Sequence, residues 1–178
     1  MLREAVQAAT PLGRRVEAVM ASGGLIDDDV IVELVRERLG QADTTPGFLL
    51  DGFPRTVPQA RKLDEMVAGR APLMIVEIVL TEAEVVRRLA SRMVCAECGT
   101  NAEDTGDGAT CHDCGGPLVP RADDREQVVL NRLEVYWSQT APLVHYYGHR
   151  PTFCRIDGAQ LPDDVTADII AAVESTGP

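Results

Sequence analysis

The segment that decides how the chain folds reads Gly47-Phe48-Leu49-Leu50-Asp51-Gly52-Phe53-Pro54-Arg55-Thr56-Val57-Pro58-Gln59-Ala60. Residues 47–50 form a short apolar run between turn residues, which predicts a buried strand. Residues 57–67 predict a helix that tolerates a proline in its first turn. The strand would bring Asp51, Gly52 and Arg55 to the carboxyl edge of a parallel sheet, where open α/β sheets bind ligands.

The polar residues of this segment suit a phosphorylated ligand that carries a base. Gly52 lets a ligand approach the backbone closely. Arg55 can bind a phosphate through two parallel hydrogen bonds. Gln59 offers a paired donor and acceptor for the edge of a base. From the residues alone, an ordinary strand–turn–helix connection with incidental polar groups explains the segment equally well.

The flanking sequence alternates between helical and strand patterns. Residues 73–80 are nearly all apolar, which predicts a parallel strand covered on both faces. A long helix is expected from Asp123 and Asp124, interrupted at Pro142. The other expected elements are helices over 2–9, 12–22, 30–39, 81–92 and 161–174 and a strand over 152–156. This alternation predicts an α/β fold with a parallel sheet and helices on both faces.

Four cysteines form two Cys-x-x-Cys pairs separated by twelve residues, Cys95 with Cys98 and Cys111 with Cys114. Two such pairs can place four thiolates around one Zn²⁺ ion, and the glycines that follow each pair permit the tight backbone this requires. Four protein ligands leave no open position, so the metal would be structural. Two disulfides or four free thiols are the alternatives.

Arginines stand on both sides of the cysteine segment. Arg88 and Arg92 lie four residues apart on one helical face before it, and Arg121 and Arg132 follow it. Convergent guanidinium groups are typical of phosphate sites. The alternative is that these arginines are solvated and pair with nearby acidic residues, namely Asp123, Asp124 and Glu126.

Composition limits the classes of partner. The chain has 178 residues, a formal net charge of −11 and a sequence pI of about 4.6, which argues against a broad nucleic-acid face. It holds no apolar run of about twenty residues and no apolar signal core. We therefore expect a cytoplasmic protein that binds neither nucleic acid nor a membrane, and in that compartment paired cysteines favour metal over disulfides.

Taken together, these pieces resemble adenylate kinase almost from end to end. The run from Asp51 to Thr56 with Gln59 is typical of nucleoside monophosphate kinases, and the four-cysteine insertion is typical of the zinc-bearing adenylate kinases. The other matching pieces, in the family's order, are Met1-Leu2-Arg3, Gly23-Gly24-Leu25-Ile26, residues 88–92, 121–124, 131–136, 139–143 and 146–147, and Ile156-Asp157-Gly158.

The resemblance implies a monomer with a P-loop-kinase-like parallel sheet, helices on both faces and a small zinc-binding lid. Its expected segments are residues 1–26 for an AMP-binding helical part, 27–92 for core elements with the AMP-site loop, 93–121 for the lid, and 122–178 for the remaining core with its long helix, last strand and C-terminal helix.

The resemblance also implies a reaction, ATP plus AMP giving two ADP with Mg²⁺ on the nucleotide, in adenine nucleotide homeostasis. The residues expected around AMP are Arg3, Gly24, Leu25, Ile26, Gly52, Phe53, Pro54, Arg55, Gln59, Arg121 and Arg132. Those expected around ATP are Arg88, Arg92 and Gln160. In the transfer itself, Arg88, Arg92, Arg121 and Arg132 would neutralise charge and Asp51 would hold a water on Mg²⁺.

The sequence departs from the family in three places. The family opens with a strand and a Gly-x-x-x-x-Gly-Lys loop, and the 178 residues contain neither; Lys62, the one lysine, lies in a predicted helix. We expect Met1 to be an internal methionine of a longer protein, a genuinely short protein being the alternative. Asn101-Ala102 replace a Thr-Tyr pair near ATP, and Gln160 stands where a cationic residue is common.

These departures leave three hypotheses. The first is a phosphotransferase that turns over little without its phosphate-binding loop. The second is a catalytically inactive nucleotide-binding remnant, and the third is a zinc-ribbon interaction module. The match outside the cysteines, at Arg55, Gln59 and Arg132, argues against the third.

Overall fold

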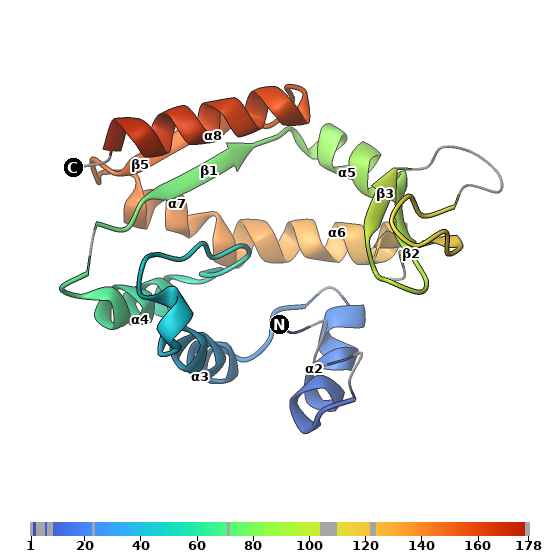
Figure 1. Cartoon of the computed structure of the whole chain (residues 1–178), viewed down its shortest axis with the longest axis horizontal. Coiled ribbons are helices and arrows are strands. Elements are labelled where there is room, and N and C mark those ends of the chain that lie inside the picture. Colours follow the sequence, from blue (N-terminus) through green and yellow to red (C-terminus); the bar gives the residue numbers. More distant parts are fainter. Residues whose placement is uncertain are drawn as a thin grey trace. The chain divides into compact units, whose positions relative to one another are not determined.

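A computed structural model of the chain describes residues 2, 6, 9–22, 24–70, 72–103, 110–121 and 124–176. It shows two compact units, each assembled from two stretches of sequence. The first, which we call the cysteine unit, comprises Met1–Leu25 and Thr81–Glu134. The second, the sheet unit, comprises Ile26–Leu80 and Val135–Pro178. Figure 1 labels their helices and strands.

The sheet unit contains the predicted parallel strands. β1 (Ile75–Val79) pairs in parallel with β5 (Phe153–Asp157), and α8 (Pro162–Thr176) packs against β5. The two strands and the final helix predicted from sequence are thereby confirmed, and with them the α/β class. The prediction that β1 is covered on both faces is wrong, because Ile78 and Val79 are 51% and 42% exposed.

The buried strand predicted over residues 47–50 is not formed. Phe48 and Leu50 pack against the helical core, but Leu49 between them is 84% exposed. Residues 47–50 form neither a helix nor a strand. A strand requires a neighbour to take its backbone hydrogen bonds, and among the described residues none pairs with this run.

Two helices that begin with side-chain caps build the core of the sheet unit. Asp27 caps α3 (Asp28–Leu39) by accepting from the Asp29 N–H at 3.0 Å, and Thr56 caps α4 (Val57–Val67). Such caps satisfy N–H groups that the first helical turn leaves without a partner. Both helices confirm their predictions, and they bury the core residues Val35, Leu39, Leu63 and Val67 between them. A short 3₁₀ turn, η1 (Ala42–Thr44), follows α3.

The predicted long helix is interrupted at the expected proline. α6 (Glu126–Val135) continues into a π-helical turn, η3 (Tyr136–Thr140), and then α7 (Pro142–Tyr147). The Ala141 N–H donates to the Tyr136 carbonyl at 2.8 Å, five residues back, because Pro142 has no N–H to continue the regular pattern. The predicted start at residues 123–124 lies before α6, and Asp123 is outside the described residues.

The cysteine unit holds two further helices and a small sheet. α2 (Pro11–Ala21) and α5 (Glu82–Ala90) match predictions over 12–22 and 81–92, α5 ending two residues early. The antiparallel sheet has the order β3-β2-β4 and consists of β2 (Arg92–Cys95), β3 (Asn101–Glu103) and β4 (Leu118–Pro120). The predicted helix over 2–9 lies largely outside the described residues, although Leu2 and Val6 are helical.

The described helices are too short or too polar for a bilayer span. The functional segments 1–26, 27–92, 93–121 and 122–178 stay predictions.

An ion pair between Asp64 of α4 and Arg150, which lies three residues after the end of α7, links these two parts of the sheet unit. Asp64 accepts from Tyr146 Oη at 2.8 Å and from both terminal nitrogens of Arg150 at 2.9 and 2.6 Å. Burial raises the pKa of Asp64, but the hydrogen bonds from Arg150 and Tyr146 outweigh it and hold the pKa below its usual value. The Arg150 guanidinium also lies 4.4 Å above the ring of Tyr147, which is 2% exposed.

We predict that Asp64→Ala lowers the free energy of unfolding of the sheet unit by about 2–3 kcal/mol, because it leaves the Arg150 guanidinium without its charged partner in a partly buried place. The measurement is urea unfolding followed by the fluorescence of Trp137, the only tryptophan. Glu65→Ala is the matched control, since Glu65 is 63% exposed and, among the described residues, pairs with exposed Lys62 alone. Equal effects of the two variants would contradict the prediction.

Candidate functional site

The turn after residue 50 requires glycine at position 52. Gly52 has a φ of +74°, in the left-handed region, and a Cβ there would lie 2.9 Å from Nη2 of Arg55. Arg55 Nε donates to the Gly52 carbonyl at 2.9 Å. The group that lies close to the Gly52 backbone is therefore the guanidinium of Arg55. This exposed side chain folds back over the turn.

The backbone of Arg55 is fixed on both sides. Its carbonyl accepts from Oγ1 of Thr140 at 2.9 Å, and its N–H donates to Oε1 of Gln59 at 2.7 Å. These contacts come from the π-helical turn and from α4. The arginine thus starts from a positioned backbone, which lowers the conformational entropy lost when its side chain binds an anion.

Gln59, predicted to contact a base, is 2% exposed. Its Nε2 donates to Oδ1 of Asp28 at 2.6 Å, and the second oxygen of Asp28 accepts from Oγ1 of Thr56 at 2.9 Å. The sequence analysis did not single out Asp28, because its partners lie 28 and 31 residues away. In the sequence it is one of three consecutive aspartates at a helix start.

The other residues expected around AMP lie in different parts of the chain. Phe53 packs against the helical core, and Pro54 beside it is partly buried. Gly24 and Leu25 belong to the cysteine unit, whereas Ile26 belongs to the sheet unit. Arg3 lies outside the described residues. Their roles stay predictions.

Two predicted phosphate-binding arginines share one buried carboxylate. Asp124, 4% exposed, accepts from Nε and Nη2 of Arg92 at 2.7 and 2.6 Å and from Nη1 of Arg132 at 3.2 Å. Pairing with Asp124, the alternative considered above, is confirmed for both. The Asp124 carboxylate therefore holds both guanidinium groups at one place within the cysteine unit.

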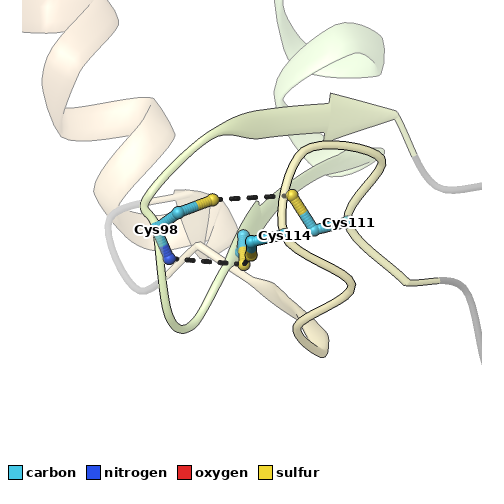
Figure 2. A group of neighbouring side chains, drawn as sticks. Cys98, Cys111 and Cys114 are labelled. Atoms are coloured by element: carbon cyan, nitrogen blue, oxygen red, sulfur yellow. Dashed lines mark hydrogen bonds between the residues drawn. The ribbon is translucent and has the colours of Figure 1, made fainter.

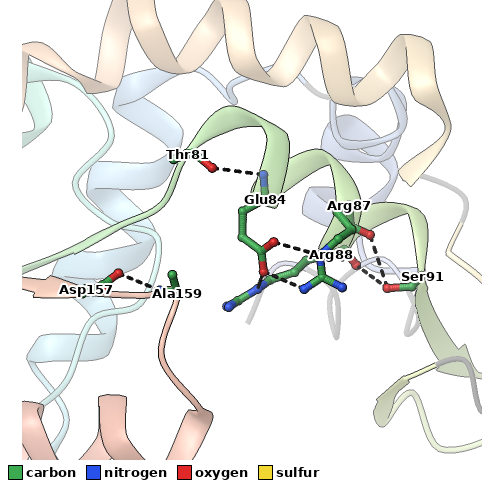
Figure 3. A network of polar contacts seen from close by, with 7 residues as sticks. All are labelled: Thr81, Glu84, Arg87, Arg88, Ser91, Asp157 and Ala159. Atoms are coloured by element: carbon green, nitrogen blue, oxygen red, sulfur yellow. Dashed lines mark hydrogen bonds and ion pairs between the residues drawn. The ribbon is translucent and has the colours of Figure 1, made fainter.

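A second shared carboxylate lies on α5, as Figure 3 shows. Glu84 accepts from Arg87 at 2.7 and 2.8 Å and from Nε of Arg88 at 2.6 Å. Hydrogen bonds from Arg87 and then Arg88 lower the pKa of Glu84 to about 2. Arg87 was missed by the sequence analysis, which treated only Arg88 and Arg92 as a pair on one helical face.

The remaining predicted residues have polar partners of their own. Arg121 donates to the Asn101 side chain at 3.5 Å. Gln160 donates to the Asp157 carbonyl at 3.1 Å and to Asp168 at 2.8 Å. Asp51 is exposed.

The four predicted metal ligands come together. Their sulfur atoms all lie within 4.8 Å of one another, and the Cys98–Cys111 and Cys95–Cys114 pairs are each 3.5 Å apart. Figure 2 shows the Cys98 and Cys111 sulfur atoms facing one another. Tetrahedral bonds of about 2.3 Å to zinc would set the sulfur atoms about 3.8 Å apart. None is in a disulfide, and the four could hold a metal ion.

The backbone around the cysteines repeats one turn twice. Gly99 and Gly115 both adopt left-handed φ values, 76° and 74°. Their N–H groups donate to the carbonyls of Cys95 and Cys111 at 3.1 and 2.8 Å. The prediction that glycines permit these tight turns is confirmed.

The thiols differ in their readiness to ionise. The hydroxyl and backbone of Thr100, with neighbouring thiols, lower the pKa of Cys98 to about 6. The backbone at Gly116 lowers the pKa of Cys114, but the Cys98 and Cys95 sulfurs outweigh it and raise it to about 12.

We predict that Glu84 titrates near pH 2 in a carbon-detected NMR titration. Its folded pKa lies below the ordinary 4.5, so the ionised carboxylate stabilises the fold above about pH 4.5, and this contribution is lost as the pH falls towards about 2. Arg87→Gln and Arg88→Gln should each raise the pKa of Glu84, Arg87→Gln by more. A carboxyl that titrates at its ordinary pKa would contradict the shared pairing.

Comparison with known proteins shows the family of the chain. A family model described as adenylate kinase matches residues 1–152. Similar proteins include the adenylate kinase of Acidothermus cellulolyticus, 45% identical over 97% of this chain and 82% of that protein, and that of Moorella thermoacetica, 44% identical over 99% and 83%. The adenylate kinase of Citrifermentans bemidjiense is 40% identical over 98% and 85%. The chain belongs to the adenylate kinase family of nucleoside monophosphate kinases.

Proposed function

We propose that this chain serves the transfer of a phosphoryl group from ATP to AMP, giving two ADP. The observation that carries the proposal is the positioned loop of residues 52–59. There, an exposed arginine is folded over a glycine turn, and a glutamine amide is held beside it. A phosphate and an adenine base are the chemical partners of those two groups.

In the proposed reaction, an oxygen of the AMP phosphate attacks the γ-phosphorus of ATP. The bond between that phosphorus and the β–γ bridging oxygen breaks, and the electron pair leaves with ADP. Charge spreads over the transferring group, so catalysis consists mainly of positioning and charge neutralisation. Arg55, with Arg3, would bind the AMP phosphate.

The arginines of the cysteine unit would supply the neutralising charge. Arg92 with Arg132, and Arg88 with Arg87, each share one carboxylate, which holds the two guanidinium groups of each pair close together. Because the carboxylate fixes both guanidinium groups before a nucleotide arrives, little reorganisation is needed on binding. Arg121 would act with Arg132, and Gln160 would lie near the ATP base.

Two metal ions are part of the proposal. Mg²⁺ would bind with ATP, and the exposed carboxylate of Asp51 would hold one of its waters. Zn²⁺ would occupy the four cysteines as a structural ion, since thiolates are soft ligands that select zinc over magnesium. The cytoplasmic location and the monomeric state stay predictions.

A nucleotide-binding protein without turnover is the second candidate. It is favoured by one observation, that the 178 residues contain no Gly-x-x-x-x-Gly-Lys run and only one lysine, Lys62 in α4. That run normally cradles the ATP phosphates with backbone N–H groups and a lysine. AMP binding without ADP formation would identify this second candidate.

The test is ADP formation from ATP and AMP by a coupled assay. We expect little turnover from the 178 residues alone and robust turnover when they are preceded by the strand and loop with which the family opens. In that longer protein, Arg55→Ala should raise the KM for AMP about a hundredfold, because a charge-assisted contact to the phosphate is lost. Arg61→Ala, an exposed change in α4, should alter it little.

Each outcome has a separate meaning. No turnover from the longer protein would overturn the proposed reaction. Robust turnover from the 178 residues alone would show that the phosphate-binding loop is dispensable. Equal KM values for Arg55→Ala and Arg61→Ala would remove Arg55 from the AMP site.

For the metal, we predict one zinc ion per chain by elemental analysis after dialysis. Cys98→Ser should lower the zinc content well below one, because a hydroxyl is a much poorer zinc ligand than a thiolate. Cys154→Ser, which changes a cysteine of β5 outside the cluster, should leave it unchanged. Full zinc content in Cys98→Ser would contradict a four-thiolate site.

A further inference from the structure

Asp28, the first residue of α3, is bound to two residues of the loop proposed to hold AMP. Its Oδ1 accepts from Nε2 of Gln59 at 2.6 Å and its Oδ2 from Oγ1 of Thr56 at 2.9 Å. Thr56 and Gln59 are 8% and 2% exposed. Because both side chains are buried, water cannot readily replace Asp28 as their hydrogen-bond acceptor.

These contacts determine which way round the Gln59 amide lies. A carboxylate can only accept, so the NH₂ group must face Asp28, and the Arg55 N–H can only donate, so the amide oxygen must face Arg55. The reversed amide would set donor against donor at Arg55 and acceptor against acceptor at Asp28.

The same contacts leave one donor and one acceptor. A glutamine amide has two N–H donors and an oxygen with two lone pairs. Asp28 takes one N–H and Arg55 takes one lone pair, so one N–H and one lone pair of the amide are used by neither of them. That pair is complementary to N7 and the 6-amino group of adenine. Hypoxanthine carries an oxygen in place of the amine and would face the amide oxygen with an acceptor.

A purely structural role for Asp28 as a helix cap explains less. Asp27 already caps α3 through the Asp29 N–H, and both oxygens of Asp28 are bound by side chains of the loop. The Thr56 hydroxyl that donates to Asp28 also accepts from the Gln59 N–H at 3.2 Å. Asp28 therefore fixes the start of α4 and the Gln59 side chain together.

We propose that Asp28 is a positioning residue that fixes the Gln59 amide and thereby selects adenine over hypoxanthine in the monophosphate site. The inference rests on the proposed function, because it requires AMP to bind at this loop. It assigns base selectivity to a residue that touches no nucleotide.

The experiment is calorimetric titration of the zinc-loaded 178-residue chain with AMP and with IMP, whose base is hypoxanthine. We expect the wild type to favour AMP. Asp28→Ala should weaken AMP binding about tenfold and IMP binding much less, since removal of a charged acceptor frees the amide. Asp28→Asn, which keeps one oxygen for Gln59, should fall between Asp28→Ala and the wild type. Asp29→Asn, an exposed neighbour, should match the wild type.

Three results would overturn the inference. Equal weakening of AMP and IMP in both Asp28 variants would show a structural role only. Wild-type affinities in both variants would show no role. If the wild type did not bind AMP, the proposed function would fail first and the inference with it. Circular dichroism shows whether each variant is folded. If Asp28→Ala is unfolded, the AMP and IMP affinities of Asp28→Asn alone decide the outcome.

Discussion

Carboxylates that each bind two other side chains hold the described loops and helices in place. A carboxylate removed from water is costly unless its oxygens are hydrogen-bonded, and it offers enough lone pairs for several donors. Asp124 meets this requirement with two arginines, Glu84 with two, and Asp64 with an arginine and a tyrosine. Asp28 meets it with two uncharged side chains. The candidate site and the helical core therefore depend on the same constraint.

The side chains that bind each carboxylate determine what that carboxylate contributes to a binding site. Where two arginines share it, two guanidinium groups are held at one place in a chain whose formal net charge is −11. Where uncharged groups share it, as at Asp28, the result is orientation without excess charge. Phosphate neutralisation needs the first arrangement and recognition of a neutral base needs the second. The acidic composition and the arginine pairs are thus compatible, because each pair gathers its two guanidinium groups around one carboxylate.

Local signals in the sequence were enough to predict α2 to α5, α8, the strands β1 and β5 and the cysteine cluster. Capping residues, apolar spacing and Cys-x-x-Cys spacing depend on near neighbours, and they were interpreted correctly at α3, α4 and Cys95–Cys114. The predictions over 47–50 and for the covering of β1 failed because both depend on partners distant in sequence. Apolar residues indicate that a segment suits burial, but Leu49 is 84% exposed because no described element packs on it. Asp28 was missed for the same reason, because its partners lie 28 and 31 residues away. Arg87 differs, because its partner Glu84 lies only three residues before it, a spacing that the sequence does reveal.

Gln59 shows how this limit bears on function. The residue type predicts a donor and an acceptor, yet the folded chain uses half of that capacity internally, 31 residues away at Asp28 and at the backbone of Arg55. The specificity of a site is a difference between affinities, and that difference is set by the groups that remain after internal hydrogen bonds are made. A glutamine free to rotate could accept either arrangement of donors and acceptors on a base, whereas one held at both ends accepts one. In the proposed site, selectivity for the base would therefore be a property of the network around Gln59, and a change to that network would act on the ligand without touching it.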